Sequence, residues 1–166
     1  MGAPNLTPMA WQESYLLGFA AMDATHQEFV ACVAALQTAT DAQLDASLAA
    51  FEIHAVQHFA DEQQWMEGSA FPATECHVDE HMKVLASVRE VQDILRATPE
   101  RRQVARDLAQ ALVDWFPGHA DYMDASLSHW MSQRVHGGAP VVLRRNMAQP
   151  DTLNIANNTH TKGVSA

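Results

Sequence analysis

Between Phe19 and Arg134 the apolar residues recur every three or four positions, which is the spacing of an amphipathic helix and not the alternation of a strand. Glycine and proline are scarce in this part of the chain, and they separate the periodic segments. Asp41 and Thr98 are suitable N-cap residues, and Pro99 suits a first helical position. The pattern therefore predicts four helices, at residues 20–39, 42–68, 73–96 and 99–135.

Each predicted helix carries one apolar stripe, and ionisable residues occur within every stripe. The stripe of the second helix keeps an unbroken 4-3-4-3-4-3 spacing: Leu44, Leu48, Phe51, Ala55, His58, Glu62 and Trp65. The stripe of the fourth helix is read in the same way: Leu108, Leu112, Trp115, His119, Tyr122, Ser126 and Trp130. Four such helices joined by short loops predict an all-α fold, an antiparallel up-down-up-down four-helix bundle of residues 19–136.

The two ends of the chain differ from the bundle in composition. Residues 1–18 predict an irregular N-terminal arm that lays Trp11 and Tyr15 against the helices. Residues 137–166 are rich in glycine, proline and asparagine and predict a C-terminal tail without a core of its own. The apolar and basic segment 141–145 makes this tail the candidate docking site for a protein partner, whose identity the sequence does not indicate.

Composition narrows the class of protein. A chain of 166 residues is about one domain long, and its 48% hydrophobic residues can form a core. Its longest apolar run, Phe29 to Leu36, is far shorter than the roughly 20 residues of a membrane-spanning helix. The net charge of −10 argues against sequence-independent nucleic-acid binding. The N-terminus lacks the pattern of a signal peptide and there are two cysteines, so we expect a cytoplasmic protein.

Nine histidines are present, and several of them lie on the apolar stripes. Burying an ionisable group is costly unless it is paired or binds a metal, so a set spread over four stripes indicates a metal site. The candidate ligands are His26, His58, Glu62, His77, His81, His119 and Asp124. Seven ligands are too many for one tetrahedral zinc ion, but they suit two ions that share bridging carboxylates. A ferritin-like di-iron site needs Glu-x-x-His on two helices, and this chain offers only Asp23-x-x-His26.

These spacings resemble those of the bacterial hemerythrins. The family pattern is a Trp and a Gly before Asp-x-x-His, followed by His-x-x-x-Glu, His-x-x-x-His and His-x-x-x-x-Asp, one motif on each helix. The chain matches this pattern over about residues 9–131 with Trp11, Gly18, Asp23-Ala-Thr-His26, His58-Phe-Ala-Asp-Glu62, His77-Val-Asp-Glu-His81 and His119-Ala-Asp-Tyr-Met-Asp124. All four motifs occur in the expected order, which makes the resemblance specific.

The resemblance implies two iron ions that cycle between Fe(II) and Fe(III). His77, His81 and His119 would hold one iron, and His26 and His58 the other. A bridging hydroxide or oxide would join the two irons, together with the carboxylates of two further residues, Glu62 and Asp124. The iron with two histidines would keep one open position, at which O2 binds reversibly.

The function implied is an oxygen carrier, store or sensor and not an enzyme. Two alternatives stay open. One is a di-iron enzyme that acts on peroxide or nitric oxide, and the other is an iron- or oxygen-sensing protein that uses the tail to bind a partner. Neither a nucleotide-binding motif nor a fused signalling domain is evident in the sequence.

The fourth helix is predicted to be irregular. Residues five apart on an ideal helix differ by 500°, so His119 and Asp124 would point about 140° apart. Pro117 removes a helical hydrogen bond, and Gly118 lets the backbone deviate. We therefore expect a widened, π-type turn or a kink between about Val113 and Asp124, which would bring both side chains to one site.

Two residues near the motifs are open to interpretation. His54 lies one turn before His58 and is extra to the family pattern. It is either an edge residue with one ring nitrogen toward solvent, or a hydrogen-bond donor or alternative ligand near the open iron. Cys76 precedes His77 and is expected to be a thiol on the helix surface.

Overall fold

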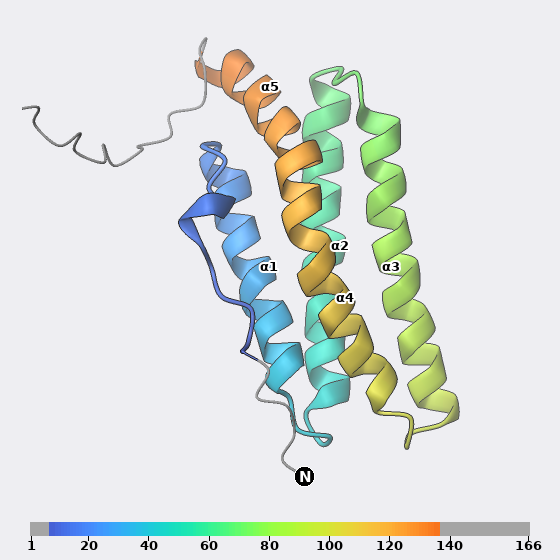
Figure 1. Ribbon diagram of the computed structural model, residues 1–166. Helices are drawn as coiled ribbons and strands as arrows, with labels where there is room; N and C mark the ends of the chain where they lie inside the picture. Colours follow the sequence, from blue (N-terminus) through green and yellow to red (C-terminus); the bar gives the residue numbers. More distant parts are fainter. Residues whose placement is uncertain (1–6, 137–166) are drawn as a thin grey trace, which may run out of the picture.

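The computed structural model describes residues 7–136 and arranges them as an antiparallel bundle of four helical rods (Figure 1). After the short 3-10 turn η1 (Glu13–Tyr15), the elements in chain order are α1 (Ala20–Thr38), α2 (Leu44–Gly68), α3 (Thr74–Ala97), α4 (Gln103–His119), the π-helical turn η2 (Ala120–Asp124) and α5 (Ala125–His136). The last three elements form one continuous rod, which packs through α4 against α1 and α3. The structure confirms the predicted all-α bundle.

Three of the four predicted helices agree with the observed bounds within a few residues, but the predicted caps are wrong. α2 begins at Leu44, and the Asp41 carboxylate forms an ion pair with Arg106 of α4. Thr98 ends α3, and its carbonyl accepts a turn hydrogen bond from Arg101 N–H at 3.0 Å. As a result α4 begins later than predicted, at Gln103. Neither Asp41 nor Thr98 therefore lies at the N-cap position, which is occupied by Gln43 in α2 and by Arg102 in α4.

The buried apolar residues form two clusters, one at each end of the bundle. The larger cluster includes Phe29, Phe51 and Phe116 and fills the half where α1 meets α2 and α3 meets α4. The smaller cluster, of Met22, Met66, Phe71 and Leu127, fills the other half. In α1 the ligand His26 lies between Met22 of the smaller cluster and Phe29 of the larger one, whereas Phe59 and Ala120 of the larger cluster lie within the ligand layer itself. No described helix is long and apolar enough to cross a membrane.

The N-terminal arm packs against the bundle, as predicted. Tyr15 meets the ring of Phe116 edge-on, with 5.2 Å between centroids. The buried carboxylate of Asp23 accepts hydrogen bonds from the backbone N–H groups of Leu17 at 2.7 Å and Gly18 at 2.9 Å. Gly18 has a φ of 90°, which a side chain would strain. Residues 137–166 lie outside the described residues, so the tail remains a prediction.

The apolar stripe predicted for the last rod is wrong at Tyr122 and Ser126, whereas Trp130 packs against the smaller apolar cluster as predicted. Tyr122 is 82% exposed and Ser126 is exposed, whereas Leu127 is fully buried. The π-helical turn holds one more residue than an α-helical turn, so the buried face shifts by one position along the chain. An α-helical register that is continued through this turn therefore selects the wrong residues.

The packing of α2 yields a stability prediction. Phe51 is fully buried in the larger cluster, and Ile53 on the same helix is 73% exposed. We expect Phe51→Ala to lower the free energy of unfolding by about 3–5 kcal/mol, since it loses apolar burial and leaves a cavity. The matched change Ile53→Ala should alter it by less than about 0.5 kcal/mol. Urea unfolding followed by circular dichroism measures both, and equal effects would contradict the packing described.

Candidate metal centre

The structure brings all seven predicted ligands together in one layer across the bundle. α1 supplies His26, α2 supplies one histidine and one glutamate four residues apart, and α3 supplies two histidines at the same spacing. His119 ends α4, and Asp124 ends the π-helical turn. None of the seven is more than 7% exposed. Residues four apart share a helix face, which explains why single helices can present pairs of ligands.

The ligand atoms fall into two groups that share one residue. The first group is Glu62, His77, His81, His119 and Asp124, and the second is His26, His58 and Glu62. Within each group, one ligand atom from every residue lies within 4.8 Å of the others. The arrangement therefore has a half with three histidines and a half with two histidines.

Glu62 lies between the two halves. Its Oε1 is 2.9 Å from Nε2 of His58, in the two-histidine half. Its Oε2 is 3.4 Å from Nε2 of His77 and 3.4 Å from Nε2 of His81, in the three-histidine half.

Asp124 repeats this arrangement from the opposite rod. Its Oδ2 is 3.2 Å from Nε2 of His26, and its Oδ1 is 3.0 Å from Nε2 of His77 and 3.2 Å from Nε2 of His119. Each carboxylate thus directs one oxygen to each half.

The donor set fits metal ions better than it fits a hydrogen-bonded core. Nε2 of His119 is 3.1 Å from Nε2 of His77 and 3.0 Å from Nε2 of His81, so three ring nitrogens converge on one point. A neutral imidazole carries a single N–H, so hydrogen bonds cannot satisfy all three nitrogens and the carboxylates at once. Buried atoms without a hydrogen-bond partner include Glu62 Oε2 and Asp124 Oδ1. Imidazole and carboxylate together are the ligands of iron and similar transition metals.

Comparison with known proteins agrees with this geometry. The sequence model of the family described as "Hemerythrin HHE cation binding domain" matches residues 17–130. A bacteriohemerythrin of Ralstonia nicotianae (strain ATCC BAA-1114 / GMI1000) is 40% identical over 124 residues, which are 75% of this chain and 89% of that protein. The chain belongs to the hemerythrin family. The family match begins at the end of the arm and continues through all four rods of this hemerythrin.

The carboxylates set the charge state of the metal-free hemerythrin site. Burial disfavours the charged form of His26 and His77, but the carboxylates of Asp124 and Glu62 outweigh burial and raise the pKa of each histidine to about 9. Burial lowers the pKa of His81 to about 3, so this ring is neutral. Burial also acts to raise the pKa of Glu62 and Asp124, but the surrounding histidines hold both pKa values below their usual range.

The π-helical turn explains how His119 and Asp124 reach the same cluster, and it confirms the irregularity predicted from their spacing. The turn spans Ala120–Asp124 and begins two residues after Gly118. A π-helical turn closes over one more residue than an α-helical turn, so two side chains five apart share a face. Pro117 itself lies inside α4, and the irregularity starts after His119.

Aromatic side chains enclose the hemerythrin site on the side of the larger apolar cluster. Phe59 stacks on the ring of His81 with centroids 3.8 Å apart, and Trp115 stacks on His119 at 4.2 Å. Our sequence analysis did not assign either residue to the site. A signal was available for Trp115, which lies four residues before His119 on the same helix face.

His54 has features of both interpretations. Its Nδ1 is 3.6 Å from the exposed carboxylate of Glu28, so this nitrogen faces the edge of the bundle. Its Nε2 is buried without a hydrogen-bond partner, and its ring lies 5.5 Å from the ring of His58. Burial, the largest cause, lowers the pKa of His54. Cys76 is exposed on α3, as expected.

The π-helical turn generates a prediction about helix length. Removing the exposed residue Asp121 would leave His119 and Asp124 four positions apart, where an α-helix separates them by only about 40°. We therefore expect this deletion to convert the turn to α-helix and to keep the metal content. Deleting Asp114 from the regular part of α4 should abolish metal binding, because it rotates the downstream ligands away from the site. Metal analysis of both purified variants measures the difference, and loss of metal from the first would contradict this account.

The pKa values generate a prediction about protons. His26 and His77, each with a pKa of about 9, are protonated at pH 7.5 in the metal-free chain and must lose a proton to bind a metal. We expect His26 and His77 to release about two protons per chain on loading at pH 7.5, and almost none above about pH 10, whereas a bridging hydroxide formed from water would add one proton at either pH. Calorimetry in buffers of different ionisation enthalpy measures this number.

The same two pKa values fix how the stability of the metal-free chain depends on pH. Because the pKa values of His26 and His77 are raised above 6.5, their protonation stabilises the metal-free fold fully below about pH 6.5, and this contribution is lost as the pH rises through 9.

The variant His26→Gln tests the prediction about proton release, because it should reduce the number of protons released on metal loading by about one. An unchanged release in this variant would show that another group carries the proton.

Proposed function

We propose that this hemerythrin binds O2 reversibly at a non-haem di-iron centre. One observation carries the proposal: Glu62 and Asp124 each turn one carboxylate oxygen to the two-histidine half and the other to the three-histidine half. Two ions bridged by two carboxylates require this arrangement. The family match and the similarity to a protein named bacteriohemerythrin support it.

The two halves assign the ligands. His77, His81 and His119 would hold one iron, His26 and His58 the other, and the two carboxylates would bridge the irons together with a hydroxide or oxide. Because one half offers three imidazoles and the other two, the second iron has one protein ligand fewer and can accept a small neutral ligand. When bound, the iron pair supplies two electrons to O2 reversibly by cycling between Fe(II) and Fe(III).

The protein's own residues would make the binding reversible by excluding water. His26 and Glu62 are fully buried, and Phe29 and Phe116 pack next to them as a stacked pair with centroids 4.9 Å apart. Phe59 extends the apolar wall toward the three-histidine half. Reduced oxygen leaves such a site as peroxide only if protons and water reach it, so the aromatic wall favours release as O2.

Three further expectations belong to this proposal. The protein acts in the cytoplasm, it binds neither nucleic acid nor membranes, and residues 137–166 form a tail outside the bundle of residues 19–136. If a protein partner exists, the tail is where we expect it to dock. The expectation that the chain is an oxygen-binding protein and not an enzyme rests on the same resemblance.

The proposal is tested by metal analysis and by absorption spectroscopy. We expect about two irons per chain, since two bridged ions use all seven ligands. The anaerobically reduced protein should gain a visible band on exposure to air and lose it when oxygen is removed. Glu62→Ala should lose both irons because Glu62 is shared, whereas Glu67→Ala, an exposed glutamate on the same helix, should keep them.

Two outcomes would contradict the proposal. One tightly held zinc and no iron after expression in iron-replete medium would exclude a di-iron centre. Rapid and repeated consumption of peroxide or nitric oxide with a simple reductant, without a stable oxygen adduct, would identify an enzyme instead.

A further inference from the structure

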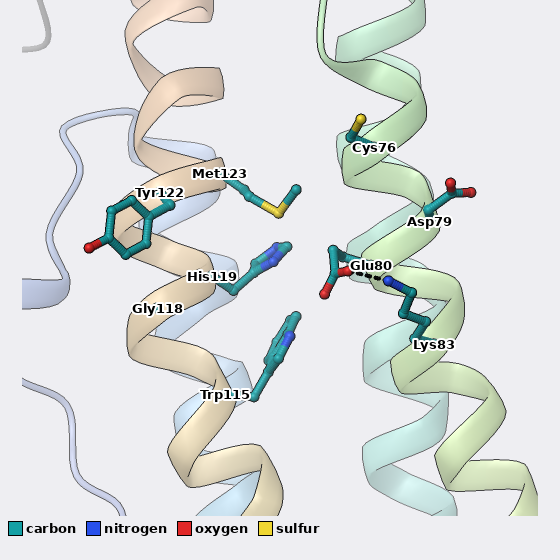
Figure 2. Close-up of a pocket in the computed structure, with 9 residues that line it drawn as sticks. All are labelled: Cys76, Asp79, Glu80, Lys83, Trp115, Gly118, His119, Tyr122 and Met123. Carbon is teal, nitrogen blue, oxygen red and sulfur yellow. Dashed lines mark hydrogen bonds and ion pairs between the residues drawn. The ribbon is translucent and has the colours of Figure 1, made fainter.

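A surface cavity of about 610 Å³ lies between α3 and the rod formed by α4 and the π-helical turn (Figure 2). One wall carries Trp115 and His119, and the opposite wall carries Asp79, Glu80 and Lys83. His119 is the one candidate ligand that lines this cavity. Two other cavities described in the structure, near α2 and α3 and near α1 and α2, are lined by none of the seven ligands.

His119 connects this cavity directly to the buried cluster. Its side chain is 97% buried, and its Nε2 lies 3.0 Å from Nε2 of His81 and 3.2 Å from Oδ1 of Asp124. The same ring lines the cavity, so a single imidazole separates the cavity from the three-histidine half.

The mouth of the cavity carries opposing charges. Asp79 is exposed, and the side chain of Glu80 is 34% exposed. In Figure 2 the Glu80 carboxylate lies in the space between α3 and the rings of His119 and Trp115. Lys83 is 72% exposed and forms an ion pair with Glu80 at 2.5 Å. Asp79 also lines the cavity, although in Figure 2 its carboxylate points away from the rings of His119 and Trp115. The Lys83 ammonium group is held by the Glu80 carboxylate, which lies nearer to the ligand.

We propose that this cavity is the route by which divalent iron reaches the buried centre from solvent, with Asp79 and Glu80 attracting the cation and His119 receiving it. The inference rests on the proposed function, because it assumes that the seven residues bind metal. It assigns a separate task to residues outside the ligand set, namely the uptake of a hydrated dication.

Charge and ligand chemistry both support this route. A dication is drawn to a cleft lined with carboxylates, and such steering raises association rates and weakens as salt is added. Carboxylate oxygens are ligands of hard ions and exchange with water, whereas imidazole suits the transition metals held deeper in the site. Lys83 has the opposite effect, because its ammonium repels the arriving cation and occupies the Glu80 carboxylate.

Because the carboxylates and the ammonium group act on the cation in opposite ways, removing the one or the other should change the rate of metal loading in opposite directions. Full-length chain freed of metal by chelation is mixed with Co(II) at low ionic strength, and the rise of the cobalt absorption is followed by stopped flow. The double variant Asp79→Asn/Glu80→Gln should load about threefold to tenfold more slowly than the wild type, and Lys83→Gln should load faster. Both effects should shrink at about 0.5 M salt. The matched control is Glu13→Gln/Glu28→Gln, which also removes two exposed carboxylate charges, at residues that do not line this cavity.

Release of cobalt from the loaded chain to excess chelator provides a second measurement that does not need metal-free protein. If the metal enters and leaves by the same route, substitutions in that route change the rates of uptake and release by the same factor. The double variant should therefore also release cobalt more slowly. Its final metal content should equal that of the wild type.

Each result decides between explanations. If Asp79→Asn/Glu80→Gln and the control Glu13→Gln/Glu28→Gln are slowed equally, the effect is one of net charge and the route is wrong. If the final metal content of the double variant falls, its carboxylates hold the metal and do not guide it, which also overturns the proposal. If the wild type binds no metal at all, it is the proposed di-iron centre that fails.

Discussion

Seven ionisable side chains are confined to a single layer inside a small helical bundle, and the rest of the structure depends on how their charges are balanced. Two carboxylates and five imidazoles cannot satisfy one another through hydrogen bonds alone, since the ring nitrogens converge within about 3 Å. Cations at the two points where the ligands meet would resolve this conflict. The interior of the bundle is therefore suited to bind metal ions, which would balance the charges of the seven side chains. This agrees with its membership of the hemerythrin family.

The π-helical turn and the aromatic rings stacked on two histidines both help to position the side chains of this layer. The π-helical turn adds one residue between His119 and Asp124 so that the same rod contributes to both halves of the cluster. Stacked aromatic rings then fix the imidazoles in place, with Phe59 on His81 and Trp115 on His119. Rings held in this way keep their orientation whether or not a metal is bound, which lowers the reorganisation needed for binding.

Sequence reasoning was most successful where periodicity carries the information. The stripes predicted the bundle and the approximate bounds of its helices, and the motif spacings predicted the residues that meet in the layer. The predicted caps were wrong because each helix begins after a turn that follows the expected cap residue, and Asp41 pairs with Arg106, a residue far away in the sequence. The exposure of Tyr122 was missed, although the irregular turn that causes it was expected from the ligand spacing. The stacking partners could not be ranked, because many aromatic residues lie on the same stripes.

The division of the apolar core into two clusters has a consequence for how the bundle unfolds. The clusters at the two ends share no buried apolar residue, and the ionisable layer lies between them. The continuous helices and this layer are what join one end to the other. A layer whose charges are balanced makes the two ends unfold cooperatively as one unit, whereas an unbalanced layer lets either end open alone. In this protein the charge balance of the residues suited to bind metal thus contributes, with the continuous helices, to the coupling between the two ends of the bundle.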